Sequence, residues 1–521
     1  MENIEEFSFK EKYQEGLKYI QSKNYDKAEN IFYEILKKSP DHLNSLFLMG
    51  FSLYEQKKNS IALKYLVKAS MLKKNFRDAD YFIGKIYKNT KQLNKAKQYF
   101  NKILNEYPND LNVLISLVTT KIDLKELNDA SSLLKKNKKL FKNQETFENL
   151  NGYLYLHSGQ NNLSIQHYLN AHKINPNNLN TLINLAHVYL RNLDFLNSKK
   201  YFKIVLNLSP KNPDALLGYS YFQFYSGDVK NGLINYEYRK IVNNYNPTLF
   251  KNFKEWDGEN LDNKTILILS EQGIGDIIQF SRYIFFIKKK YKVKIIFQLK
   301  KNLFHLFEDK DLDLREGKGK LPFFDYFIFL LSLPKIIHLQ EKILVKNFNY
   351  IKINNENLKK WEAKLRVFKG KKIGISWQGD QYYIRDSMRS VKLKIFEPLF
   401  KNKKLNFINL QSGFGKEQIR HFKFKDKLID FSDEIEEEEN AFEETISILK
   451  NLDLIITVDS ALAHLAGTLE VNTWLIQHYS PEWRWQVQNK KFSWYPKHKF
   501  FKQKRIDNWD NVIHEISKKL D

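Results

Sequence analysis

The fold of the C-terminal half is decided by Ile266-Leu-Ile-Leu-Ser-Glu-Gln-Gly-Ile-Gly-Asp276-Ile-Ile-Gln-Phe-Ser-Arg-Tyr283. A short apolar strand runs into a Gly273-x-Gly275 turn and then directly into an amphipathic helix, with Asp276 at its start. Glycine lets a loop backbone approach a bound ligand closely, so the turn first suggests a phosphate cradle. Strand-glycine-helix turns also occur in α/β domains without ligands. The neighbouring segments therefore decide its meaning.

Strands and helices alternate after this turn, which is typical of parallel sheets with crossover helices. A second strand and turn, Lys372-Ile-Gly-Ile-Ser-Trp-Gln-Gly-Asp380, restarts the same layout. We therefore expect a linker at 247–264, a first lobe at 265–370 and a second lobe at 371–521. Parallel sheets bind ligands at the carboxyl ends of their strands, so a cleft between the lobes is the expected site. The other expected elements are strands at 294–298, 324–329, 407–411 and 452–459 and a helix through 361–368.

The N-terminal half repeats itself every 34 residues. Glycines recur at Gly16, Gly50 and Gly84, and alanines follow at Ala28, Ala62 and Ala96. This period and these small residues indicate tetratricopeptide repeats, each a pair of antiparallel helices. About seven units fit between residues 9 and 246. We expect an α-solenoid over 1–246 that binds a protein or peptide partner in its groove.

The composition limits the classes of partner. The formal net charge is +25, but the excess is nearly all lysine, 74 Lys against 11 Arg, spread along the whole chain. This distribution indicates compositional bias, so we expect no nucleic-acid partner, and a weak peripheral contact with an acidic membrane stays open. The chain has no cysteine, which excludes disulfides and thiolate metal sites. The first residues lack the secretion-signal pattern, so we expect a cytoplasmic protein.

The segment Leu454-Ile-Ile-Thr-Val-Asp-Ser-Ala-Leu-Ala-His464-Leu-Ala-Gly467 carries the strongest strand-end signal. Apolar strand residues end at Asp459-Ser460, and small residues then open a helix that carries His464. Free backbone N–H groups and the helix dipole at such a start suit a diphosphate. The alternative is that Asp459 or Ser460 caps the helix and His464 packs against the sheet. The motif alone leaves both interpretations open.

Several motifs occur in one order that resembles a known family. They are the Gly-x-Gly-Asp276 turn, Ser376-Trp-x-Gly379, Arg389-Ser390, Asn-Leu-Gln411, the helix start at Val458–Gly467, and Ser480-Pro-Glu-Trp-Arg-Trp485. Together they resemble the tetratricopeptide-linked glycosyltransferases of family 9, which are related to bacterial heptosyltransferases. The resemblance implies a two-lobed glycosyltransferase-B fold, a double Rossmann-like domain. It also implies a nucleotide-diphosphate-sugar donor and inverting transfer without a metal or other cofactor, and no Asp-x-Asp motif stands at a plausible strand end.

The resemblance also implies roles for single residues. Asp276 matches the catalytic carboxylate, which takes the proton from the acceptor hydroxyl. Ser460, Ala461 and His464 match the helix start that stabilises the leaving diphosphate, with His464 as the second catalytic residue. Trp377 either lines the cleft or packs in the core. The substrate- and donor-binding residues expected from the motifs are Gly273, Gly275, Ser376, Trp377, Gly379, Arg385, Arg389, Gln411, Asp459, Ser460 and Ala461.

The leading hypothesis is a glycosyltransferase of hexosyl or heptosyl type, and the rival is a non-catalytic protein-interaction scaffold with a degenerate transferase domain. Tyr382 and Tyr383 crowd the loop before Arg389, which leaves the donor nucleotide open. The acceptor also stays open between a glycan, a lipid-linked molecule and a protein. The repeat array resembles that of tetratricopeptide-bearing protein O-GlcNAc transferases in architecture only. Their asparagine ladder is not repeated at the inner positions, which weighs against a peptide acceptor; these positions are Gln14, Leu48, Phe82, Ser116, Leu150, Asn184 and Gly218.

Overall fold

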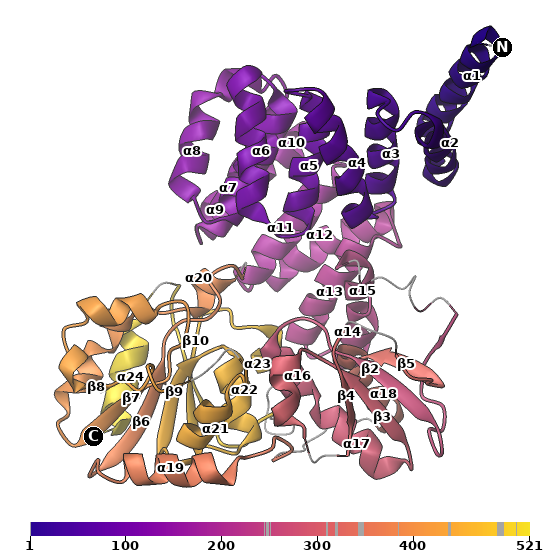
Figure 1. Cartoon of the computed structure of the whole chain (residues 1–521). Coiled ribbons are helices and arrows are strands. Elements are labelled where there is room, and N and C mark those ends of the chain that lie inside the picture. The colour runs from indigo at the N-terminus through magenta and orange to yellow at the C-terminus, as the bar shows by residue number, and fades with distance from the viewer. Residues whose placement is uncertain are drawn as a thin grey trace. The chain divides into compact units, whose positions relative to one another are not determined.

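The computed structural model describes residues 2–243, 245, 250, 252–308, 311–317, 321–341, 349–383, 385–435, 439–486, 494–506 and 508–520 (Figure 1). The chain forms two compact units, one up to Asn177 and one from Asn178 onward, and each is described by itself. The expected boundary between residues 246 and 247 and most of the acidic run 436–439 lie outside the described residues.

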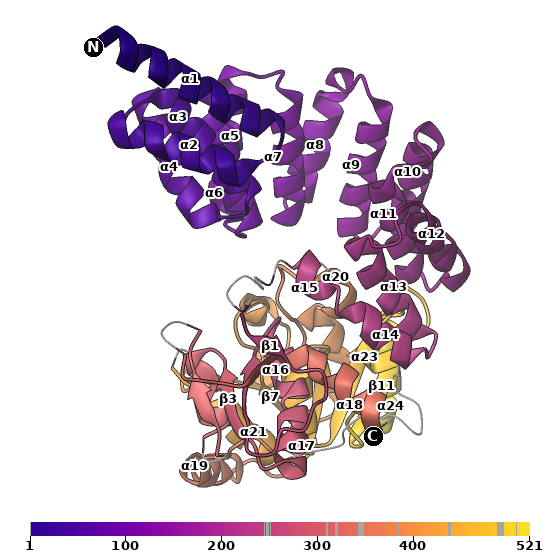
Figure 2. The ribbon, with the colours of Figure 1, turned by 90° about the vertical axis from the view of Figure 1, so that its right-hand side faces the viewer.

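The first unit is built from successive helix pairs (Figures 1 and 2). The first helices of three consecutive pairs begin at Leu43, Arg77 and Leu111, which keeps the 34-residue period of the sequence. The elements are α1 (Glu2–Gln21), α2 (Tyr25–Lys38), α3 (Leu43–Glu55), α4 (Asn59–Leu72), α5 (Arg77–Asn89), α6 (Leu93–Glu106), α7 (Leu111–Asp123), α8 (Leu127–Lys136), η1 (Lys138–Leu140), α9 (Gln144–His157) and α10 (Asn161–Ile174).

The recurring glycines let the two helices of a pair approach each other closely. A Cβ atom on Gly84 would lie 2.6 Å from Cε1 of Phe100, a fully buried side chain on the partner helix. Gly16 has the same relation to Phe32, and Gly152 to Tyr168. Each aromatic ring therefore fills the space that a larger residue would need, and this contact fixes the register of the pair.

The second unit begins with five helices, and the first helices of its two pairs start 34 residues apart, at Leu179 and Pro213. The five helices are α11 (Leu179–Arg191), α12 (Phe195–Leu208), α13 (Pro213–Tyr225), α14 (Val229–Tyr236) and α15 (Arg239–Val242). Phe224, Leu233 and Tyr236 belong to the same buried cluster as the strands and helices that follow. The end of the helical array and the α/β part therefore share one core.

The first sheet is five-stranded and parallel in the order β1-β5-β2-β3-β4. The strand β1 lies within the segment that we expected to be a linker, and it pairs with β5. The elements are β1 (Lys254–Glu255), β2 (Thr265–Leu269), α16 (Ile274–Phe280), α17 (Arg282–Lys290), β3 (Lys294–Gln298), η3 (Lys301–Leu306), β4 (Asp313–Arg315), β5 (Tyr326–Phe329), η4 (Leu330–Ser332) and α18 (Leu333–Glu341).

The second sheet is six-stranded and parallel in the order β11-β10-β9-β6-β7-β8. Parallel sheets with crossover helices, as predicted from the alternating pattern, are thereby confirmed. The elements are α19 (Asn355–Leu365), β6 (Lys371–Ser376), α20 (Asp386–Arg389), η5 (Leu393–Lys401), β7 (Leu405–Asn409), η6 (Lys416–His421), η7 (Lys425–Lys427), β8 (Leu428–Ile429), α21 (Glu443–Lys450), β9 (Leu454–Val458), α22 (Ala461–Thr468), β10 (Thr473–Gln477), α23 (Trp483–Gln486), β11 (His498–Lys502) and α24 (Asp510–Leu520).

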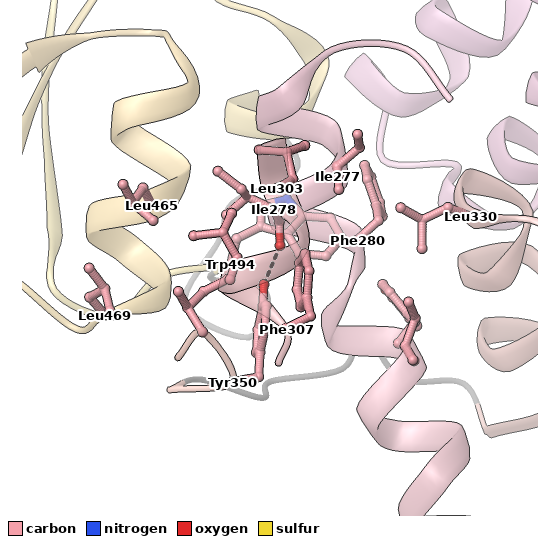
Figure 3. Packing of buried hydrophobic residues seen from close by; sticks show 14 of the residues in the cluster. Ile277, Ile278, Phe280, Leu303, Phe307, Leu330, Tyr350, Leu465, Leu469 and Trp494 are labelled. Carbon is pink, nitrogen blue, oxygen red and sulfur yellow. Dashed lines mark hydrogen bonds between the residues drawn. The ribbon is translucent and has the colours of Figure 1, made fainter. Parts of the chain in front are cut away.

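Buried side chains from both lobes meet in one apolar cluster, part of which Figure 3 shows from close by. Ile277, Ile278 and Phe280 of α16 belong to it together with Leu465 and Leu469 at the second lobe. The hydroxyl of Tyr350 donates to the carbonyl oxygen of Ile278 within this cluster. The lobes are therefore joined by a shared apolar core. No helix in the described part of the chain is long and apolar enough to cross a membrane.

We predict that Gly84→Ala destabilises the first unit by about 1–2 kcal/mol, because overpacking against Phe100 outweighs the better helix propensity of alanine. The melting temperature of that unit should fall by roughly 2–6 °C in a thermal scan followed by circular dichroism. Asn89→Ala on the exposed side of the same helix is the control and should change little. An unchanged or raised melting temperature for Gly84→Ala would contradict the proposed register of the pair.

Candidate functional site

The candidate residues lie where the strand order of each sheet reverses. In the first sheet β2 lies between β3 and β5, and in the second sheet β6 lies between β7 and β9. Loops after such strands diverge to opposite faces and leave a crevice at their carboxyl ends. Asp276 follows β2, Gly379 and Arg389 follow β6, and Asp459 and Ser460 follow β9.

The loop after β2 holds Asp276 through a capping box. Gly273 is the N-cap of α16, and its backbone N–H donates to Oδ2 of Asp276 over 3.0 Å. The residue with a positive φ in this loop is Gln272, at 61°, whereas Gly273 has a φ of −88°. One carboxylate oxygen of Asp276 is therefore used to shape the turn, and the other is free to point away from it.

Gly275 is small because a helix of the second lobe lies against it. A Cβ atom there would stand 3.0 Å from Cδ2 of His464 and 3.3 Å from Cα of Ala461. The turn was first interpreted as a phosphate cradle, but Gly275 serves helix packing instead. It permits α16 and α22 to pack closely and so brings Asp276 toward the second lobe.

Asp276 forms an ion pair with Arg484 across the two lobes. Arg484 also binds Glu482, with 2.9 Å between Nη1 and Oε1, and both of its carboxylate partners are at least four-fifths buried. Burial alone lowers the pKa of Arg484, but Asp276 and Glu482 outweigh burial and raise it well above its ordinary value. Arg484 therefore stays charged and bridges the two acidic side chains.

A small pocket of about 20 Å³ is lined by Glu482, the second carboxylate partner of Arg484. Nη1 of Arg389 donates to the carbonyl oxygen of Asp459 over 3.1 Å, and its guanidinium occupies the space next to Gly379, where a Cβ atom would be 2.5 Å away. Nη2 of Arg385 donates to the carbonyl oxygen of Ser480 over 3.0 Å. The pocket is lined by Tyr383, Arg385, Met388, Arg389, Asp459, Ile476, Gln477, His478, Ser480, Pro481, Glu482 and Trp485.

On residues that line this pocket, three buried polar atoms have no hydrogen-bond partner within the described part of the chain. They are Nε2 of Gln477, Oγ of Ser480 and Nε1 of Trp485, on side chains that are 5%, 1% and 5% exposed. A buried polar group without a partner costs about 1–3 kcal/mol, so several together indicate a place built for a bound water or ligand. Two arginines and these donors favour an anionic ligand.

His464 is a buried, neutral imidazole. Its Nδ1 lies 3.1 Å from the hydroxyl of Tyr495, and its ring stacks on Trp485 with 4.9 Å between centroids. Burial, followed by the charge of Arg484, lowers its pKa well below the ordinary value. Ser460 is the N-cap of α22, but its side chain makes no capping hydrogen bond and its Oγ is buried without a partner. His464 therefore packs in the core, as the second interpretation of this motif expected. The hydroxyl of Ser460 does not cap the helix, so it stays available to a ligand, as the first interpretation expected.

Gln411 and Trp377 hold the loop after β6 and do not face the pocket. Oε1 of Gln411 accepts from the hydroxyl of Ser376 and from the backbone N–H groups of Trp377 and Gln378, at 2.9–3.0 Å. Its Nε2 donates to three carbonyl oxygens of the same region. Trp377 is fully buried in the core of the second lobe. Of the two alternatives for Trp377, the core position is therefore the one found, and the polar atoms of Ser376 and Gln411, expected to bind substrate or donor, are used within this loop.

Gln477, Ser480 and Glu482 line the pocket but were not among the site residues expected from the sequence. The strand β10, Thr473–Gln477, was not among the expected strands, although its apolar run ends immediately before these residues. Recognising that strand would have placed Gln477–Glu482 at a carboxyl edge beside Asp459. Within the described ranges, no three His, Asp or Glu side chains gather as metal ligands would.

Comparisons with known proteins find one repeat family and several proteins that are similar to part of this chain. The tetratricopeptide repeat family model matches residues 81–110. Protein FlbA of Caulobacter vibrioides is 20% identical over 285 residues, covering 51% of this chain and 48% of that protein, so the chain spans about half the length of this relative. A tetratricopeptide repeat protein from Parabacteroides merdae is 14% identical with a TM-score of 0.42, covering 47% of this chain and 96% of its own. Pseudomonas aeruginosa pilF is 16% identical with a TM-score of 0.33, and the match covers 40% of this chain and 96% of pilF. The prediction of tetratricopeptide repeats is confirmed by the family match.

We predict that acid destabilises the second unit because its buried histidines are neutral. Burial, with help from Arg385, lowers the pKa of His478 to about 4, and burial lowers that of His498 to about 4 as well. Unfolded histidines protonate below about pH 6.5, so the unfolded state binds more protons between pH 6.5 and 4. The free energy of unfolding should fall by about 1.4 kcal/mol per pH unit for each such histidine.

Urea unfolding at pH 7.5, 6.5 and 5.5, followed by tryptophan fluorescence, measures this slope. His498→Gln removes one titrating group and should make the slope shallower. A free energy of unfolding that is constant over this range contradicts the assignment of these histidines as neutral.

Proposed function

We propose that this chain is a glycosyltransferase that moves a sugar from a nucleotide-diphosphate sugar to an acceptor hydroxyl with inversion. The observation that carries the proposal is that Arg484 links Asp276 to Glu482, which lines an arginine-containing pocket whose buried polar atoms lack partners among the described residues. Two parallel sheets that meet at their switch points support a glycosyltransferase-B fold, as the ordered motifs imply.

Asp276 acts in this proposal as the general base. Its carboxylate receives the proton of the acceptor hydroxyl while that oxygen forms a bond to the anomeric carbon. The bond from the anomeric carbon to the diphosphate oxygen breaks at the same time, and the electron pair leaves with the diphosphate. Attack and departure lie on opposite faces of the sugar, so the configuration inverts.

The leaving diphosphate would lie against Arg389 and the start of α22. Arg389 presents a guanidinium beside the carbonyl of Asp459, and Ser460 has an unused hydroxyl at the helix start. Charge-assisted hydrogen bonds and the helix dipole stabilise the negative charge that develops on the leaving group. His464 supports this helix start from behind, since its ring is stacked on Trp485 and its pKa is too low for it to carry a proton at neutral pH.

Arg484 couples donor binding to the base. Its guanidinium binds Asp276 and Glu482, and a diphosphate in the neighbouring pocket offers it a stronger acceptor. Exchange of Arg484 from Asp276 to phosphate would release Oδ1 of the carboxylate to accept a hydrogen bond from the acceptor hydroxyl. The pocket of about 20 Å³ has room for little more than a water, so donor entry also requires the segment around Ser480–Glu482 to move.

The acceptor is a glycan, a lipid-linked molecule or a protein, and the repeat array is the surface that would recruit a protein or peptide partner. Nucleotide sugars are the natural donors for such chemistry in the cytoplasm, where we propose that the chain acts. A second candidate function is a protein-interaction scaffold whose transferase-like half no longer turns over. The small pocket and the ion pair that occupies Asp276 favour that alternative.

We predict that nucleoside diphosphates stabilise the chain and that Arg389→Met removes the effect. A thermal-shift panel of UDP, GDP and ADP, each at 1 mM, should raise the melting temperature for one of the three, since a ligand at 100 times its Kd adds about 2.7 kcal/mol. Arg420→Met removes an arginine from outside the pocket and serves as the control. Stabilisation by none of the three nucleotides favours the scaffold.

We predict that Asp276→Asn lowers the turnover of the nucleotide sugar selected by that panel by at least 100-fold, because the amide cannot accept the proton. Release of nucleoside diphosphate, measured by chromatography, checks this result, and a nucleotide-induced thermal shift like that of the unmodified chain shows that the donor still binds. Turnover that survives the substitution removes Asp276 from the role of base.

A further inference from the structure

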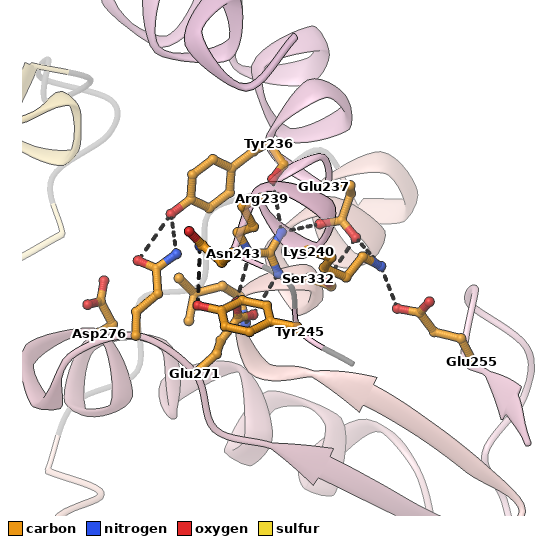
Figure 4. A network of polar contacts seen from close by, with 12 residues as sticks. Tyr236, Glu237, Arg239, Lys240, Asn243, Tyr245, Glu255, Glu271, Asp276 and Ser332 are labelled. Atoms are coloured by element: carbon orange, nitrogen blue, oxygen red, sulfur yellow. Dashed lines mark hydrogen bonds and ion pairs between the residues drawn. The ribbon is translucent and has the colours of Figure 1, made fainter. Parts of the chain in front are cut away.

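We propose that the ion pair between Arg239 and Glu271 is a positioning device, by which the last tetratricopeptide repeat fixes Asp276 opposite Arg484. The inference rests on the proposed function, since it assigns a positioning role toward the base of that reaction. Arg239 begins α15, directly after the last helix pair, and Glu271 lies in the loop between β2 and α16 (Figure 4).

The pair is two-pronged and almost completely buried. Nη2 of Arg239 lies 2.6 Å from Oε1 of Glu271, and Nε lies 3.0 Å from Oε2. The side chains are each 1% exposed. The remaining donors of Arg239 bind Ser332, Glu237 and the carbonyl oxygen of Tyr236, at 2.8, 2.7 and 3.2 Å. The guanidinium is therefore satisfied on every side, and it holds Glu271 in one geometry.

A second contact holds the next residue of the same loop. Gln272 has a φ of 61°, a conformation that a residue with a side chain rarely adopts. Its Nε2 donates to the hydroxyl of Tyr236 over 2.9 Å, and Tyr236 is buried on α14. Strained backbone persists where surrounding contacts over-determine it. Arg239 and Tyr236 supply those contacts. Because Gly273 directly follows Gln272 and caps the helix that carries Asp276, the same contacts position Asp276.

The same repeat also contacts the segment that carries Arg484, the ion-pair partner of Asp276. Phe224 on α13 stacks on Trp483, with 4.0 Å between ring centroids and an angle of 15°, and the hydroxyl of Tyr225 donates to the carbonyl oxygen of Pro481. Trp483 immediately precedes Arg484. One helix pair therefore contacts the loop that carries Asp276 and the segment that carries Arg484, and it sets the separation between them.

A buried ion pair is a poor source of stability, because removing two charges from water costs about as much as their attraction returns. The core shared by the last repeat and the α/β part already contains large apolar side chains, such as Leu233 and Trp256. A charged pair at this place is therefore better explained by the directional, fork-shaped geometry that it imposes on the loop. That geometry is what a general base needs, since a misplacement of about 1 Å can cost 100-fold in rate.

The test uses the full-length chain with both partners replaced, R239M together with E271L, which removes the charges without leaving one buried alone. We expect amides of residues 268–280 to exchange hydrogen at least tenfold faster, while strands β3 and β9 exchange as before. With the nucleotide sugar selected by the panel, kcat should fall at least tenfold, and the KM for the donor should stay within twofold. Arg239→Lys keeps the charge but loses the fork and should give an intermediate effect.

Arg77→Met breaks a two-pronged but more exposed arginine–carboxylate pair with Asp110 in the first unit and is the control, which should change neither readout. Unchanged exchange over 268–280 in the double variant overturns the proposal, as does an unchanged kcat. If the double variant does not fold, Arg239→Lys decides on the same two readouts. If the unmodified chain turns over no nucleotide sugar, the proposed function is wrong. The hydrogen-exchange experiment still decides whether the Arg239–Glu271 pair holds the loop before Asp276.

Discussion

The ion pair between Asp276 and Arg484 is the interaction on which the arrangement of the candidate site depends. It joins a loop of the first sheet to a segment of the second, and it forms only because α16 and α22 pack closely at Gly275. A larger residue at that position would push His464 and Ala461 away and separate the two charges. The apolar cluster beneath, which includes Ile278 and Leu465, keeps the lobes at this distance.

The repeat array and the α/β part are joined by shared structure at the array's last pair. Phe224 and Tyr236 lie in the core of the α/β part, and Arg239 makes a buried ion pair with its first strand–helix loop. Solenoid repeats pack only against their neighbours, so the terminal repeat needs a partner that covers its end. Here the α/β part covers it, and in return the repeat positions the loop and the segment around the proposed site.

Local patterns predicted the elements well, because each depends on residues near one another in sequence. The 34-residue period gave the helix pairs, and the apolar runs before Gly273 and Asp459 gave β2 and β9. Contacts between distant segments could not be read in the same way. Nothing near Gly275 in sequence shows that its neighbour is His464, and nothing near Glu271 shows that Arg239 binds it. Gln411 illustrates the same limit, since its polar atoms are satisfied by a loop more than 30 residues away.

In the proposed reaction, the pocket lined by Arg389 and Glu482 binds the diphosphate of a nucleotide sugar. The most direct measurement is a crystal structure of the chain with the nucleoside diphosphate that stabilises it most. The account predicts phosphate oxygens within hydrogen-bond distance of Arg389 and Ser460, and an Arg484 guanidinium that has turned from Asp276 to phosphate. A nucleotide bound away from these residues, with the ion pair between Arg484 and Asp276 intact, would contradict the account.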